Sequence, residues 1–210
     1  MIYLEPSTYE LHNAEQPWSY VSTAGTMRFE VRPGDYGKYG ARNTDRSELA
    51  SRRTLEFNRT YRVSYKFMVE PGPRNTAAWL VIGQFHQTED PGERGGPPPF
   101  TVEMTGEKMR IVGRHTQQEI SSTSTYMNLY TDSSDIKRGH WYEMKITIRF
   151  DPFGDGALAV WRDGVQLVDY NGPLGYPDQV GPYWKYGVYR KTAPENFAVR
   201  FSDFSIARVR

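Results

Sequence analysis

The chain has 210 residues, 26 of them basic and 25 acidic, and it contains no cysteine. This length suits a single all-β domain, and a hydrophobic share of 38% is enough to build a core, so the chain is not disordered. The near-neutral charge excludes a typical nucleic-acid-binding domain, and the missing cysteines exclude disulfides, thiolate zinc sites and cysteine nucleophiles. No apolar run approaches the ~18 residues of a membrane helix, so we expect no membrane partner.

Apolar and polar residues alternate with a period of two along much of the chain, which predicts β-strands with one buried face. The alternation is clearest at 61–69 and 143–150, and further strands are predicted at 27–32, 77–87, 99–104, 107–115, 157–162, 165–170, 183–190 and 197–208. Asp163-Gly164 predicts a tight hairpin turn between two of these strands. No helix longer than a turn or two is predicted. We therefore expect one domain over residues 1–210, an all-β sandwich or jelly roll.

Two segments, Gly92 to Pro99 and Asn171 to Pro182, are rich in glycine and proline and cannot be interior strands. Both flank segments with candidate functional residues, so we expect them to form the walls of a cleft.

Charge is unevenly distributed along the chain. Residues 28–66 hold ten basic and five acidic side chains, and residues 183–210 hold six and two. These two basic segments could meet on one face and attract a polyanion, although scattered solvated charge would give the same count.

Three short segments carry the candidate chemistry. In Asp45-Arg46-Ser47-Glu48-Leu49, an extended strand puts Arg46 and Glu48 on one face, where the carboxylate can hold the guanidinium in place. A surface ion pair is the alternative. In Leu80 to Gln87, Gln84 and His86 lie two apart and share a face, although a lone histidine is more often structural.

The other histidines, His12, His115 and His140, have no comparable setting.

The third segment runs from Pro182 to Arg190. As a strand it presents two faces: Tyr183, Lys185, Gly187 and Tyr189 against Trp184, Tyr186 and Val188. The missing side chain at Gly187 is expected to leave room for a ligand.

Together these segments supply a guanidinium, an amide, an imidazole, an ammonium and a phenol, which suit elimination across a uronic acid. Arg46, Gln84 and also His86 can neutralise the substrate carboxylate, which makes the neighbouring C5 proton acidic. Tyr189, beside Lys185, can protonate the oxygen that leaves C4 and can also act as the base. No strand-spaced acidic motif for glycoside hydrolysis is present.

Arg46-Ser-Glu-Leu, Gln84-Phe-His86 and Tyr183-Trp-Lys-Tyr-Gly-Val-Tyr189 resemble, in the same order, the signatures of jelly-roll alginate lyases. Gly139-His-Trp-Tyr-Glu, Val160-Trp-Arg-Asp-Gly and Lys185-Tyr-Gly-Val-Tyr-Arg190 are similar to segments of the heparin lyase I and glucuronan lyase group. Tyr186 and Arg190 depart from the alginate lyase pattern, and the chain is short for a heparin lyase. The resemblance therefore favours glucuronan or a related glucuronate polymer, with alginate and heparin as alternatives.

The resemblance implies a concanavalin-like two-sheet jelly roll with a concave substrate groove. It implies Tyr189 as catalytic acid and base, His86 as the alternative base, and Lys185 as a support for Tyr189 or a contact to the substrate. Arg46 and Gln84 would neutralise the carboxylate. Further substrate contacts are assigned to Glu48, Tyr183 and Arg190.

No cofactor is expected for catalysis, but related sandwiches often hold a structural calcium, for which Glu30 and Asp203 are the candidate carboxylates. Asp151 and Asp155 could also bind calcium, although a plain β-turn explains them as well. We expect a monomeric, secreted protein that acts on an acidic polysaccharide, although no signal peptide is visible at its N-terminus. A non-catalytic carbohydrate-binding sandwich and a sandwich glycosidase are the alternatives from other functional classes.

Overall fold

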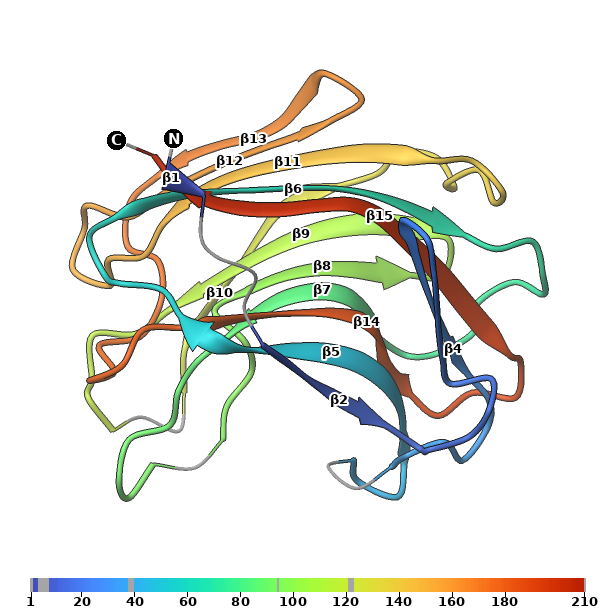
Figure 1. Cartoon of the computed structure of the whole chain (residues 1–210). Coiled ribbons are helices and arrows are strands. Elements are labelled where there is room, and N and C mark those ends of the chain that lie inside the picture. The colour runs from blue at the N-terminus through green and yellow to red at the C-terminus, as the bar shows by residue number, and fades with distance from the viewer. Residues whose placement is uncertain (1, 4–7, 38–39, 94, 121–122, 210) are drawn as a thin grey trace.

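The computed structural model describes residues 2–3, 8–37, 40–93, 95–120 and 123–209. Lys38 and Arg210, which the charge counts include, and Arg94, in the Gly92–Pro99 loop, lie outside these ranges. Two antiparallel sheets lie one above the other and form a sandwich (Figure 1), which confirms the predicted jelly-roll class. The described residues contain no helix, so none is present there that could cross a membrane.

We name each sheet after one of its inner strands, β6 and β14. The β6 sheet consists, in spatial order, of β13 (Val165–Asn171), β12 (Ala157–Arg162), β11 (Tyr142–Arg149), β6 (Thr60–Val69), β15 (Phe197–Arg208), β4 (Thr26–Val31) and β3 (Tyr20–Thr23), with β1 (Ile2–Tyr3) paired to β15. The β14 sheet consists of β10 (Thr125–Thr131), β9 (Lys108–His115), β8 (Phe100–Thr105), β7 (Leu80–His86), β14 (Tyr183–Lys191), β5 (Thr44–Thr54) and β2 (Tyr9–Asn13).

The core lies between the two sheets and is built from the apolar face of each alternating strand. Tyr65 of β6 reaches across to Trp184 of β14, with ring centroids 5.9 Å apart, and Phe85 of β7 packs against the same indole at 4.8 Å. Fully burying one large apolar side chain contributes about 1.5–3 kcal/mol. This packing fixes which face of β14 remains available to a ligand.

The predicted strands are found within a few residues of their expected ends, and the hairpin at Asp163-Gly164 has the expected positive φ angles of 52° and 78°. The strands outside the predicted ranges are β1, β2, β3, β5 and β10, although Asp45–Leu49 of β5 was treated as an extended strand. β10 is an edge strand with no fully buried residue, and so it lacks the apolar face that period-two alternation detects. β2 lies at the opposite edge of the same sheet, and only its last residue, Asn13, is buried.

Candidate active site

A cavity of about 460 Å³ lies on the face of the β14 sheet that is turned away from the core. Side chains of β5, β7, β8, β9, β10 and β14 line it, and Gly96, Pro97 and Pro98 form one wall. The Gly92–Pro99 loop is therefore a cleft wall, as predicted. The Asn171–Pro182 loop was also expected to be a wall, but none of its residues is among the described residues that line the cavity; it braces the other loop instead, because the Tyr176 hydroxyl donates to the Pro97 carbonyl at 2.7 Å.

The register of three neighbouring strands brings the three predicted segments together. Tyr189 of β14 lies opposite Arg46 of β5, while Lys185 lies opposite Gln84 and Tyr183 opposite His86 of β7. The segments are far apart in sequence, yet their polar side chains form one row across β5, β14 and β7. Five of them, Arg46, Gln84, His86, Lys185 and Tyr189, line the cavity.

Glu48 lies beneath this row with its side chain fully buried. Its carboxylate accepts a hydrogen bond from Gln84 Nε2 at 2.5 Å and lies 3.0 Å from Lys185 Nζ and 3.5 Å from Arg46 Nε. Burial alone would raise the pKa of Glu48, but the charges of Lys185 and Arg46 and the hydrogen bonds outweigh it and lower this pKa. Glu48 is thus a buried anion that positions its three partners. The prediction that Glu48 contacts the substrate is therefore wrong, because its side chain is fully buried.

Tyr189 is held on two sides. The Arg46 guanidinium lies over its ring at 3.9 Å from the centroid, and Trp79 contacts it edge-on with centroids 4.9 Å apart. A cation over the ring face attracts the π-electrons and fixes the orientation of the phenol. Arg46 therefore reaches both the Glu48 carboxylate and Tyr189, and a substrate carboxylate placed beside Tyr189 would meet the same guanidinium.

His86 is a neutral base at physiological pH. Burial and then the charge of Lys185 lower its pKa to about 4. Its Nδ1 lies 2.9 Å from the Gln87 carbonyl oxygen, so Nδ1 carries the proton in the neutral ring and Nε2 keeps a lone pair. Tyr183 stands beside it, with ring centroids 5.6 Å apart. Lys185 is also buried, which lowers its pKa, while Glu48 partly restores it.

The wall of the cavity formed by β8, β9 and β10 was not predicted. Arg110 and Arg114 of β9 lie 3.2 Å and 3.3 Å from the two carboxylate oxygens of Glu103, and Arg110 also donates to the hydroxyl of Tyr126. The signal was present in the sequence, because residues four apart on a strand share a face. These two arginines widen the positive region beyond the predicted row.

His12 was also missed, because β2 was not predicted. It lies opposite Glu48 in the register of β2 with β5. Burial lowers its pKa, and Lys185 lowers it further. His12 therefore borders the buried charge cluster of Glu48 and Lys185.

Two expectations for β14 differ from the structure. Arg190 is fully buried and pairs with Asp45 at 3.0 Å and Glu195 at 3.2 Å, so it stabilises the fold and does not reach a substrate in the groove. Gly187 has a φ of 138°, and a Cβ there would lie 2.2 Å from the Ser47 carbonyl oxygen. A glycine is required at this position because the backbone of β5 lies so close, and not because a ligand needs the space.

The proposed calcium ligands do not fit a shared ion. Glu30 pairs with Arg28 at 2.6 Å and Arg32 at 2.7 Å, while Asp203 pairs with Lys66 at 2.7 Å. Ala198 of β15 lies opposite Glu30, and Asp203 follows five residues later, about 16 Å along the strand.

Among the residues that the structure describes, no group of three or more His, Asp or Glu side chains could hold a metal. At the other candidate, Asp151 accepts from the backbone N–H of Phe153 at 2.7 Å, which is a local turn contact.

The fold and the groove define a jelly roll whose solvent-facing sheet surface carries basic, amide, imidazole and phenol groups. The profile of the family described as Polysaccharide lyase matches residues 13–204, so the chain belongs to this family and is an enzyme of that class. No curated protein sequence matches the chain.

Several solved structures share the fold. An endo-β-1,4-glucuronan lyase from the fungus Trichoderma reesei has a TM-score of 0.72 and 14% identity, with 98% of this chain and 88% of that chain covered. An alginate lyase of polysaccharide lyase family 7 has a TM-score of 0.68 and 13% identity, with 97% and 95% covered. An alginate lyase from Pseudomonas aeruginosa has a TM-score of 0.61 and 17% identity, with 98% and 100% covered.

Proposed function

We propose that this protein is a secreted, monomeric, single-domain lyase that cleaves a uronic-acid polymer, glucuronan or a related glucuronate polysaccharide, by β-elimination. The observation that carries the proposal is the position of Tyr189 under the Arg46 guanidinium, in one row with Gln84, Lys185 and His86. Elimination needs a cation and a hydrogen-bond donor for the carboxylate, a base for C5 and an acid for O4, and this row supplies all four.

The reaction begins at the substrate carboxylate. Arg46 and the Gln84 amide neutralise it, so the C5–H bond can break and its electron pair can move into an enolate-like intermediate. A pre-formed charged or polar donor is worth about 10²–10³ in rate at such a site. Glu48 holds both groups in place before the substrate arrives, so little reorganisation is needed during the reaction.

The C5 proton passes to His86 Nε2 or to the deprotonated oxygen of Tyr189, according to which face of the sugar carries it; on the second route, the proton that Tyr189 then gives to O4 is the one taken from C5. His86 suits this role because its pKa of about 4 keeps the ring neutral at pH 7. As the C4–O4 bond breaks and the C4=C5 double bond forms, Tyr189 gives its proton to O4. The products are one polymer fragment with a new reducing end and a second fragment whose non-reducing end is an unsaturated uronate.

Support for glucuronan as substrate comes from the fold similarity to the glucuronan lyase. The two sequence departures that also favoured it carry less weight, because Tyr186 is buried in the core and Arg190 is buried in an ion-pair cluster. Neither side chain reaches the groove. The β9 wall with Arg110 and Arg114 is a stronger reason to expect a uronate chain, since it places further cations along the cavity.

A glycosidase is disfavoured by the carboxylates themselves. Glu48 is fully buried with Lys185 and Arg46, and Glu103 is paired with two arginines, so neither is placed as a protonated general acid. Glycoside hydrolysis needs one such acid and a second carboxylate across the scissile bond.

The test is an ultraviolet assay for the unsaturated uronate product over glucuronan, alginate and heparin. We expect product from glucuronan and loss of turnover in Tyr189→Phe with polymer binding retained. If no uronate polymer yields unsaturated product, the proposal is wrong. If no polymer yields product while the parent and Tyr189→Phe bind a uronate polymer equally well, the chain acts as a carbohydrate-binding module.

A further inference from the structure

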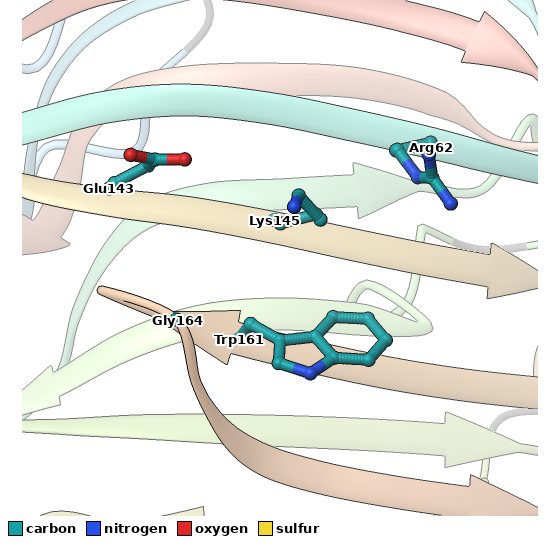
Figure 2. A pocket seen from close by; sticks show the side chains of 5 residues that line it. All are labelled: Arg62, Glu143, Lys145, Trp161 and Gly164. Carbon is teal, nitrogen blue, oxygen red and sulfur yellow. The ribbon is translucent and has the colours of Figure 1, made fainter.

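The solvent face of the β6 sheet, on the opposite side of the sandwich from the groove, carries an aromatic hollow. Trp161 of β12 lines a cavity of about 390 Å³ together with Arg62, Glu143, Lys145 and Gly164. Figure 2 shows the indole of Trp161 lying along its strand with its ring face toward the viewer. A large aromatic face is thus offered to solvent where strand alternation usually places polar side chains.

The strand register puts two cations beside this indole. Lys145 of β11 lies directly opposite Trp161, and Arg62 of β6 lies opposite Thr147, the next outward-facing residue of β11. Directly opposite residues have Cβ atoms about 4.5–5.5 Å apart. Lys145 is exposed and pairs with no carboxylate in the described part of the chain. Its ammonium is therefore available to an anionic ligand.

The Glu143 carboxylate makes one end of the hollow negative, while Lys145 and Arg62 make the rest positive. Glu143 lies two residues before Lys145 on the same face, about 6.6 Å along β11. A carboxylate bound beside Trp161 is thus repelled at the Glu143 end and attracted at the Arg62 end. A neighbouring hollow, also about 390 Å³, shares Glu143 and is lined by Trp141, so the aromatic surface continues along the sheet.

This combination fits an acidic sugar. The C–H face of a pyranose ring stacks on an indole, and its carboxylate reaches an adjacent ammonium or guanidinium. An apolar protein partner fits poorly, because Arg62, Glu143 and Lys145 would lose water without matched partners.

We propose that the hollow formed by Trp161, Lys145 and Arg62 is a second, non-catalytic binding site for an acidic polysaccharide chain. The proposal rests on the proposed function only for the choice of polymer. Because it lies on the face opposite the groove, the site would hold a polymer without taking part in cleavage. Two sites on one polymer raise the effective concentration of substrate at the groove.

The test uses the indole N–H signals of the ¹⁵N-labelled Tyr189→Phe protein, which has five tryptophans. Trp79 contacts residue 189 in the groove, and Trp161 lies in the outer hollow, so each site has its own signal. A saturated glucuronan oligosaccharide is titrated in, and then the same oligosaccharide with its carboxyl groups reduced to alcohols. Lys145→Gln tests the cation, and Lys137→Gln, at an exposed lysine outside the hollow, is the matched control.

We expect the Trp161 signal to shift with its own saturation curve. Lys145→Gln should raise the dissociation constant obtained from the Trp161 signal at least about fivefold and leave the one from the Trp79 signal unchanged. Lys137→Gln should change neither constant. If Trp161 does not respond while Trp79 does, or if the reduced oligosaccharide binds the hollow equally well, the second site is wrong and the lyase proposal stands. If Trp161 responds but the parent protein forms no unsaturated product, the site stands and the lyase proposal fails.

Discussion

Replacing Glu48 by glutamine tests whether the buried carboxylate organises the groove. The substitution keeps the shape of the side chain but removes the charge that lies 3.0 Å from Lys185 Nζ and 3.5 Å from Arg46 Nε. Breaking a buried pair by removing one partner typically costs about 3–5 kcal/mol, because the other charge is left uncompensated. Lys185 can relieve part of this cost by releasing its proton, since burial already lowers its pKa. We therefore expect a loss near the lower end, about 3 kcal/mol, at pH 7.

The pH dependence follows from the lowered pKa of Glu48. A carboxyl whose pKa is lower in the folded state stabilises the protein above its unfolded value, here 4.5, and loses that contribution as the pH falls through the folded value. The stability difference between the parent and Glu48→Gln should narrow as the pH falls below about 4.5.

Urea denaturation at a series of pH values measures this difference. Glu56→Gln is the matched control, because Glu56 is an exposed carboxylate paired with Arg59 and Arg208, and we expect it to cost less than about 1 kcal/mol. A Glu48→Gln protein within about 1 kcal/mol of the parent at pH 7 would refute the role of this carboxylate as a buried organising charge.

Three further predictions concern single side chains. If neutral His86 is the base, kcat/KM should fall on the acid side through about pH 4, and an acid limb near 6.5 would contradict its lowered pKa. Arg190→Met should destabilise the fold by about 3–5 kcal/mol in thermal or urea unfolding, because it leaves Asp45 and Glu195 without their cation; a stability equal to the parent would argue against the buried cluster. Burial, together with Glu93 and Asp90, raises the pKa of Asp178 to about 7. The free energy of unfolding should therefore fall as the pH rises from about 4 to about 7, because the unfolded state has already released this proton and the folded state has not. Asp178→Asn should remove this loss, and unfolding curves for the two proteins that differ equally at pH 5 and pH 8 would refute it.

The sequence predicted most of the sandwich because its central strands bury one face. The alternation at 61–69 and 143–150 became β6 and β11. β2 and β10 carry no such alternation, because each is an edge strand with little buried surface. His12 and Tyr126, which lie on these strands, were consequently missed as neighbours of the site.

The predicted row of Arg46, Gln84, His86, Lys185 and Tyr189 was recovered because each residue lies on the solvent-facing side of a strand whose other side is apolar. The same rule would have placed Arg190 with Trp184 on the buried side. Whether a residue on the groove side is exposed or covered depends on neighbouring strands, which one sequence does not order. For that reason Glu48 was expected to touch the substrate but is fully covered.

The most direct test of the central claim is the initial rate of unsaturated uronate formation from glucuronan by the parent and by Tyr189→Phe. The account predicts turnover by the parent and a fall in kcat of about 10²–10⁴ when the phenol oxygen is removed, since this is the usual contribution of a general acid–base group. Unchanged binding of glucuronan by Tyr189→Phe would show that only proton transfer was lost. A Tyr189→Phe protein that forms product at the parental rate would contradict the account.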